Sequence, residues 1–156
     1  MKKVVAPLSL LLGACVSGGG EPPPLPPLAQ DQAQPALALF ELVLTGHFAA
    51  FGANPPTTCA SLRPGPLTAA QEEALIARFV RLAPASRCLA ARGGWQDSIT
   101  SEPAQVVEVY DFACRTPTQC IGWVNAPGSP AKRYAMNFEN GQWRFTADPR
   151  LISDVH

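Results

Sequence analysis

The chain has 156 residues, of which 12 are Lys or Arg and 12 are Asp or Glu, so its formal net charge is zero. A balanced charge argues against a strongly basic nucleic-acid-binding protein and against an acidic disordered chain. The length suits one domain. The charged fraction of 15% is lower than the average of about 25% for globular proteins. The 17 prolines are about twice the usual share, and five of them lie between Pro22 and Pro27.

The first 14 residues have the pattern of an export signal. Lys2 and Lys3 precede an apolar stretch at residues 4–12, and the small residues Gly13 and Ala14 follow it. As a helix, the apolar stretch would extend about 14 Å. Because the hydrocarbon core of a bilayer is about 30 Å thick, the stretch is too short for an ordinary membrane span.

Leu12-Gly13-Ala14-Cys15 resembles the lipobox of bacterial lipoprotein precursors. In that family the cysteine thiol receives diacylglycerol, the peptide bond before it is cut, and the new amine is often acylated. The resemblance implies that residues 1–14 are a signal peptide and that lipidated Cys15 is the first mature residue. Two or three acyl chains would anchor the protein stably to a membrane. The alternative is an ordinary secretory signal cut near Ala14, which leaves Cys15 as a free thiol.

The resemblance also implies a location in the bacterial cell envelope. In Gram-negative members of the family, an Asp after the cysteine favours retention in the inner membrane. This chain has Val16 there, which favours the outer membrane if the source is Gram-negative.

A tether is expected between Cys15 and the domain. Residues 18–20 are all glycine and form a flexible joint, and residues 21–27 are rich in proline and favour polyproline II. We expect residues 15–34 to form the lipidated cysteine and tether, about 60 Å long when extended, and residues 35–156 to form a single domain. A PxxP docking ligand is the alternative function of the proline-rich stretch.

Two helices are expected at the start of the domain. Residues 35–51 carry apolar side chains on several helical faces, which indicates a buried helix that ends near Gly52. Thr68 and Gln71 form a capping-box pattern at the start of a second helix, and Pro84 ends its apolar stripe. The stripe consists of Leu75, Ile76, Phe79, Val80 and Ala83.

Antiparallel strands are expected after residue 104, where the apolar period changes to two. Asn140-Gly141 is a strong signal for a two-residue hairpin turn, which predicts the pairs Phe138 with Trp143, Met136 with Phe145, Tyr134 with Ala147, Asn137 with Arg144 and Arg133 with Asp148. A second hairpin is expected to join residues 105–114 to residues 120–125. It would pair Cys114 with Cys120, Phe112 with Gly122 and Tyr110 with Val124. The predicted fold is α+β, with two N-terminal helices packed on an antiparallel sheet of at least four strands.

Once Cys15 is assigned to lipid, the chain retains four cysteines, at positions 59, 88, 114 and 120. An even number in an exported domain predicts disulfides, and four cysteines allow three connectivities. We favour Cys59–Cys88 and Cys114–Cys120. A zinc site is the competing interpretation, but the chain has no CxxC motif and its only histidines are His47 and His156. No metal or other cofactor is predicted.

No catalytic motif is evident, so we predict a protein that is not an enzyme. His47 is the only internal histidine, and a satisfied histidine at the edge of the core is the simplest interpretation of it. Asp111 is expected opposite Trp123, at the edge of a pocket. Trp95 is expected in an exposed loop formed by residues 92–97, with its indole packed beneath it or in contact with a ligand. These four residues are the candidate ligand contacts.

Residues 140–149 resemble the last hairpin of NTF2-like domains, in which helices precede a curved antiparallel sheet around a pocket. The resemblance implies a pocket. In that family the pocket sometimes holds a His-Asp pair, and no matching pair is visible in this sequence. Our first hypothesis is a lipid-anchored envelope protein with a non-catalytic binding or assembly-support domain and an envelope protein as partner. One alternative is an NTF2-like pocket that binds or converts a small molecule, with His47 and Asp111 as candidates. Another is an inhibitor or immunity factor against an envelope-attacking enzyme.

Overall fold

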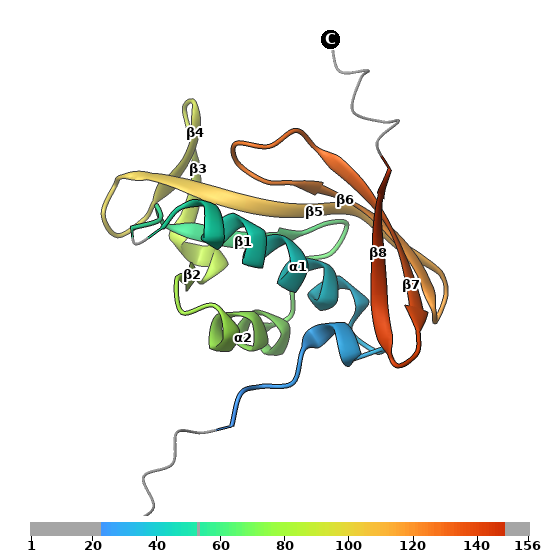
Figure 1. The fold of residues 1–156 in the computed structure, drawn as a ribbon. Helices are drawn as coiled ribbons and strands as arrows, with labels where there is room; N and C mark the ends of the chain where they lie inside the picture. Colours follow the sequence, from blue (N-terminus) through green and yellow to red (C-terminus); the bar gives the residue numbers. More distant parts are fainter. Residues whose placement is uncertain (1–22, 53, 149–156) are drawn as a thin grey trace, which may run out of the picture.

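The computed structural model describes residues 23–52 and 54–148. Cys15, the expected signal peptide and the first part of the tether lie outside these residues. The described part contains two α-helices, α1 (Pro35–Ala50) and α2 (Ala69–Arg78), and one eight-stranded sheet (Figure 1). Two disulfides link the strands. The fold is therefore α+β and disulfide-stapled, as predicted.

The sheet has the strand order β2-β1-β5-β6-β7-β8. The remaining two strands, β3 and β4, form a hairpin that joins the sheet where β4 pairs with β5. In chain order the strands are β1 (Thr58–Leu62), β2 (Leu82–Ala83), β3 (Cys88–Ala91), β4 (Gly94–Asp97), β5 (Pro103–Thr116), β6 (Gln119–Asn125), β7 (Lys132–Glu139) and β8 (Gln142–Asp148). Two short 3-10 helices, η1 (Leu28–Gln30) and η2 (Ala85–Arg87), precede α1 and β3.

The predicted order of helices before strands is wrong, and so is the purely antiparallel sheet. The unpredicted strand β1 lies between α1 and α2 and pairs in parallel with both β2 and β5. Neighbouring parallel strands need a long crossover connection, and α2 lies within the one that joins β1 to β2. The five residues of β1 are too few to show a clear apolar period, and prolines flank them closely.

Helix α1 occupies the predicted range and packs on one face of the sheet (Figure 1). Leu39, Phe40 and Leu44 are fully buried in the core that α1 shares with the inner faces of β5 to β8. Gly122 on β6 permits this close packing. A Cβ at this position would lie 2.8 Å from Cδ2 of Phe112 and 3.3 Å from Cδ2 of Leu39.

Helix α2 begins with the predicted capping box. The Thr68 hydroxyl accepts a hydrogen bond from the Gln71 backbone N–H, and the Gln71 side chain accepts one from the Thr68 backbone N–H. The helix ends at Arg78, five residues before the end of the predicted stripe. Phe79 leaves the helical conformation, and Val80 is 91% exposed instead of being buried with the other apolar residues.

The β7–β8 hairpin has the predicted register in all five pairs. Both turn residues have positive φ angles, 52° at Asn140 and 76° at Gly141. A type I′ turn requires such angles, and its twist matches that of the flanking strands. Trp143 and Met136 consequently face the core, where they are 2% and 1% exposed.

The β5–β6 hairpin was predicted only in part. Cys114 pairs with Cys120, and Phe112 packs on Gly122, as expected. Tyr110, however, pairs with Trp123 and not with Val124, because the register shifts between Tyr110 and Ala113. The shift inserts one extra residue into β5, and Asp111 within it adopts a φ of 50°. This is a β-bulge, which periodicity alone does not reveal.

The disulfides join the favoured pairs. Cys59–Cys88 links β1 to β3, across 29 positions of sequence, and Cys114–Cys120 crosses from β5 to β6. The first bond lies in a small cluster of buried residues with Ala83, apart from the main core.

Residues 26–34, which we had assigned to the tether, make contacts with the domain. An Nη2–H of Arg78 donates to the Pro26 carbonyl oxygen at 2.7 Å, and the indole N–H of Trp143 donates to the Asp31 carbonyl oxygen at 3.0 Å. Leu28, on η1, is 6% exposed and belongs to the core. Among the described residues, the recorded hydrogen bonds to the domain therefore extend back to Pro26, nine positions before α1.

Candidate ligand-binding groove

A groove of about 620 Å³ lies between the carboxyl-terminal half of α1 and strands β6 to β8. Small-molecule sites in proteins commonly have volumes of roughly 300–1,000 Å³ and are lined mainly by apolar side chains. The connection between β6 and β7 also contributes to the wall. The lining residues are mostly apolar, and those used below are Leu42, Val43, Gly46, His47, Phe51, Lys132, Tyr134 and Phe145.

Gly46 lines the groove on the helix side. A Cβ added to Gly46 would meet no other atom within 4 Å. A glycine inside a helix costs about 0.5–1 kcal/mol relative to alanine, and here no close contact explains it. The consequence of this glycine is an open space beside His47, its neighbour in α1.

The hydrogen bonds of His47 define the tautomer of its ring. The Nε2 atom lies 3.3 Å from Oγ1 of Thr58, and the Thr58 hydroxyl donates to the Pro56 carbonyl oxygen at 3.0 Å. Because a hydroxyl has only one proton to donate, Thr58 accepts a hydrogen bond from His47 Nε2–H. The Nδ1 atom is then left with a lone pair, and no described residue donates a hydrogen bond to it.

His47 is also neutral near pH 7. Burial lowers the pKa of His47 below its ordinary value of about 6.5, because an apolar environment disfavours the charged ring. The residue is 7% exposed, and its ring contacts the rings of Phe48 and Phe51 at centroid distances of 5.3 Å and 4.8 Å. His47 therefore contributes a neutral hydrogen-bond acceptor to an apolar wall.

Lys132 and Tyr134 contribute the polar groups of the opposite wall. They alternate along β7 with Arg133, so their side chains share the inner face of the sheet with Met136. Lys132 takes part in none of the three ion pairs recorded among the described residues. No Asp or Glu is among the described residues that line the groove. These residues thus contribute one positive charge to the groove.

Asp111 and Trp123 do not contribute to this groove. Asp111 is exposed at the β5 bulge, so His47 and Asp111 are not brought together in one pocket. Trp123 alternates with the buried residues Gly122 and Val124 and therefore points to the outer face. Its ring stacks on that of Tyr110, with centroids 6.1 Å apart. The predicted placement of Asp111 opposite Trp123 is wrong, because the bulge puts Tyr110 there.

Trp95 lies in the β3–β4 hairpin, which stands out from the rest of the sheet (Figure 1). The predicted loop at residues 92–97 is therefore wrong, since Gly93, with a φ of 94°, turns the chain between two strands. Trp95 is 43% exposed and lines a smaller cleft of about 270 Å³ beside Cys59 and Cys88. Of the four candidate contacts, only His47 lies in the larger groove.

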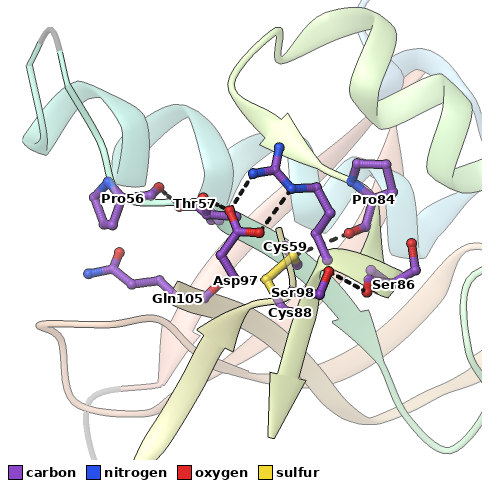
Figure 2. The surroundings of a disulfide bond; sticks show 12 residues. Pro56, Thr57, Cys59, Pro84, Ser86, Cys88, Asp97, Ser98 and Gln105 are labelled. Atoms are coloured by element: carbon purple, nitrogen blue, oxygen red, sulfur yellow. Dashed lines mark hydrogen bonds and ion pairs between the residues drawn. A yellow bond between two sulfur atoms is a disulfide. The ribbon is translucent and has the colours of Figure 1, made fainter. Parts of the chain in front are cut away.

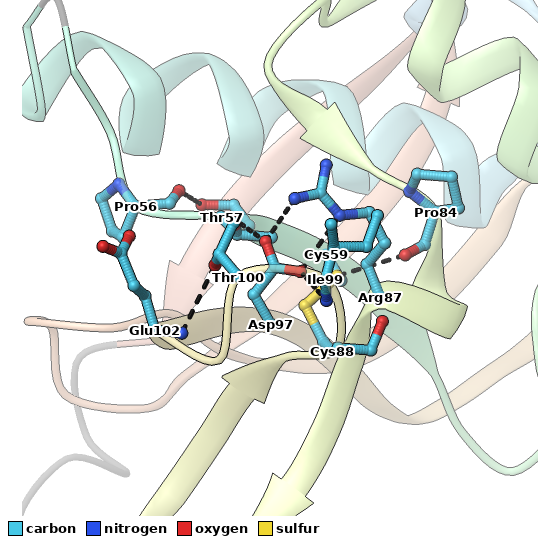
Figure 3. Close-up of polar contacts among 12 residues, drawn as sticks. Pro56, Thr57, Cys59, Pro84, Arg87, Cys88, Asp97, Ile99, Thr100 and Glu102 are labelled. Atoms are coloured by element: carbon cyan, nitrogen blue, oxygen red, sulfur yellow. Dashed lines mark hydrogen bonds and ion pairs between the residues drawn. A yellow bond between two sulfur atoms is a disulfide. The ribbon is translucent and has the colours of Figure 1, made fainter.

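A buried carboxylate holds this hairpin against the sheet. Asp97, at the end of β4, has no exposed surface and accepts hydrogen bonds from the Arg87 guanidinium and the Thr57 hydroxyl. This carboxylate lies beside the Cys59–Cys88 disulfide (Figure 2). The backbone N–H of Ile99 also donates to it at 2.9 Å, and Figure 3 shows Arg87, Thr57 and Ile99 around Asp97. Together these interactions fix the hairpin that carries Trp95.

Sequence reasoning did not identify Gly46, Lys132 or Tyr134 as groove residues. Tyr134 had been placed on the apolar face of the β7–β8 hairpin, and the same period of two puts Lys132 on that face. This alternation could have predicted that Lys132 lies on the inner face of the sheet. The position of Gly46 in a predicted helix carried no comparable signal, because its significance depends on what lies opposite it.

Comparison of the chain with protein-family models, curated proteins and solved structures gives no significant match. Among residues 23–52 and 54–148, no three His, Cys, Asp or Glu side chains are grouped so that they could hold a metal ion. No helix within these ranges is long and apolar enough to cross a membrane.

The Asp97 network predicts a pH dependence of stability. Hydrogen bonds from Arg87, Thr57 and Ile99 hold the pKa of Asp97 well below its usual range. Because the folded-state pKa is lowered, the stability that ionised Asp97 contributes is present above its ordinary pKa of about 3.9 and is lost as the pH falls toward the folded-state value. We expect Asp97→Asn to lower the Tm strongly at neutral pH, and this Tm difference to shrink progressively below about pH 5.

Thermal unfolding followed by circular dichroism at a series of pH values measures this difference. Asp111→Asn is the matched control, since Asp111 is exposed and asparagine tolerates its positive φ. The control variant should follow the wild type at every pH. A Tm difference for Asp97→Asn that stays constant into the acid range would contradict the assigned role of the carboxylate.

Proposed function

We propose that this chain is a lipid-anchored bacterial envelope protein whose domain binds a small, largely apolar molecule without converting it. The groove between α1 and strands β6 to β8 carries the binding part of this proposal. It combines a suitable volume and apolar walls with a few polar groups, which are the usual properties of a small-molecule site.

The lipid anchor is supported by the resemblance of Leu12-Gly13-Ala14-Cys15 to a lipobox. Two disulfides are consistent with an oxidising compartment outside the cytosol. Because Pro26 already contacts the domain, the tether that we propose between the lipid and the domain spans at most residues 16–25. At about 3.1 Å per residue in polyproline II, it would hold the domain within roughly 30 Å of the lipid surface.

Binding without conversion is supported by the chemistry of the groove. His47 is neutral and has an acceptor nitrogen, but no carboxylate lines the groove to orient it or to stabilise its charged form. Nucleophilic catalysis usually needs a nucleophile beside a base that a third group orients. The groove lining contains no cysteine, and its one serine, Ser129, makes no recorded hydrogen bond to His47.

An NTF2-like pocket that converts a small molecule is the second candidate. The observation that favours it is the packing of α1 on one sheet face beside an open groove, which resembles the arrangement in that family. In this alternative His47 would act without Asp111. Turnover of a groove ligand by the wild type, together with its loss in His47→Gln at unchanged ligand affinity, would favour the second candidate over the first.

The anchor predicts the behaviour of a Cys15→Ala variant in its native envelope. Without the thiol there is no acceptor for diacylglycerol, so metabolic labelling with palmitate should disappear and the maturation cut should not occur. Val16→Ala, which preserves the cysteine, is the control and should be labelled like the wild type. Equal palmitate labelling of the Cys15→Ala variant and the wild type would exclude this anchor.

If the groove binds the ligand, a large side chain at Gly46 should reduce binding. Gly46 lines the groove, and a Cβ at this position would meet no other atom within 4 Å, so a larger side chain can be introduced there without a clash at its Cβ. We expect Gly46→Phe to reduce ligand capture in the groove at least tenfold, whereas Gly46→Ala should retain capture and gain about 0.5–1 kcal/mol of stability. The probe is a long-chain alcohol that carries a photoreactive diazirine.

The experiment uses the mature lipidated protein in phosphatidylcholine nanodiscs, and mass spectrometry locates the crosslinked peptides. Crosslinks should fall on α1 and on strands β7 and β8. Thermal unfolding of both Gly46 variants shows whether they are folded. The proposed binding site would be rejected if Gly46→Phe, while folded, were labelled on these peptides as strongly as the wild type.

A further inference from the structure

Among the described residues that line the groove, Lys132 carries the only charged side chain. It makes none of the recorded ion pairs within the described residues, and no carboxylate of the lining faces it. Its β7 neighbour Arg133 points to the opposite face of the sheet, where it pairs in register with Asp148. The groove therefore has a positive charge that the lining does not balance.

The helix side of the groove is unfavourable for an anion. Ala50, the last residue of α1, is part of the lining, and a helix carboxyl terminus carries a partial negative charge equivalent to about −0.5. His47, whose pKa is lowered by burial, offers no positive charge to a negatively charged oxygen. An anionic group of a ligand is thus stabilised only beside Lys132, and the part of the ligand near α1 must be uncharged.

The single positive charge of Lys132 limits the negative charge that a ligand can carry in the groove. One ammonium group can balance one carboxylate. A phosphate monoester carries about −1.5 to −2 charges near pH 7, and the groove offers it no arginine and no helix amino terminus. Leu42 and Val43 of α1 and Phe145 of β8 supply an apolar wall that suits a hydrocarbon chain.

We infer that the groove binds a long-chain carboxylate, with the carboxylate paired to Lys132 and the hydrocarbon chain along the apolar wall between α1 and β8. This inference rests on the proposed function, because it specifies the ligand class of the same groove. The basis of selectivity is charge: an alcohol of equal length fills the same space but cannot form the charge-assisted pair.

The test compares two diazirine probes of equal chain length, one ending in a carboxylate and one in a hydroxyl. The mature lipidated protein is again held in phosphatidylcholine nanodiscs, and crosslinks are mapped to the peptides of α1, β7 and β8. Hydrogen bonds to charged groups are stronger than those between neutral groups, so at subsaturating concentrations the wild type should capture the carboxylate at least tenfold more efficiently than the alcohol.

Lys132→Gln should reduce capture of the carboxylate to the level of the alcohol, while capture of the alcohol stays unchanged. Lys132→Arg should restore the preference, because it restores the charge. Arg133→Gln removes a positive charge one position away, on the other face of the sheet, and should leave the preference intact. This control separates a contact in the groove from attraction by the overall charge of the protein.

The outcomes distinguish the inference from the proposed function. If the wild type captures both probes equally in the groove, or if Lys132→Gln keeps the preference for the carboxylate, the inference is overturned and the apolar groove remains. If neither probe crosslinks to the groove peptides, or if Gly46→Phe leaves both labelled, the groove is not a binding site and both proposals fail.

Discussion

The burial of α1 constrains the rest of the structure. This helix is apolar on several faces, so it is stable only where most of its circumference is covered, and most helical stability in proteins comes from such packing. One sheet can cover only part of a helix. Leu39, Phe40 and Leu44 are buried in the core. Because Gly122 has no side chain, Leu39 and Phe112 can both pack against it. The η1 segment covers a further part through Leu28. Another face of α1 is not fully covered, and Leu42, in the middle of the helix, remains 41% exposed.

The groove follows from this incomplete covering, and its chemistry follows from the few polar groups that reach it. Thr58 fixes the His47 ring from the side of β1, which leaves an acceptor nitrogen directed away from that hydrogen bond. Lys132 supplies a positive charge from β7. The two walls therefore differ in electrostatic character: the helix wall disfavours an anion and the sheet wall attracts one. The Asp97 network and the Cys59–Cys88 disulfide lie in another part of the sheet, where they hold the β3–β4 hairpin without contributing to the groove.

Local sequence patterns were sufficient to predict the elements whose structure depends on neighbouring residues. The Asn140-Gly141 turn and the alternating apolar residues predicted every pair of the β7–β8 hairpin, because a slip of one residue would move its apolar side chains to the wrong face. Thr68 and Gln71 predicted the start of α2, and cysteine parity with spacing favoured the observed disulfides. The five-residue strand β1 and the bulge at Asp111 depend on pairing with distant strands, and neither has a distinct periodic pattern. The groove could not be predicted because it arises where α1 and the sheet meet, and Gly46 and Lys132 are close to it only in the folded chain.

The central claim is that His47 is a neutral acceptor in an open apolar groove. The most direct measurement is the long-range ¹H–¹⁵N NMR spectrum of the histidine side chains in the mature protein, with His47→Gln used to assign the signals. We predict the Nε2–H tautomer near pH 7, with Nδ1 unprotonated and with an Nδ1 shift that changes when the diazirine alcohol binds. A protonated ring at this pH, an Nδ1–H tautomer, or an Nδ1 signal that does not respond to the bound alcohol would contradict the account.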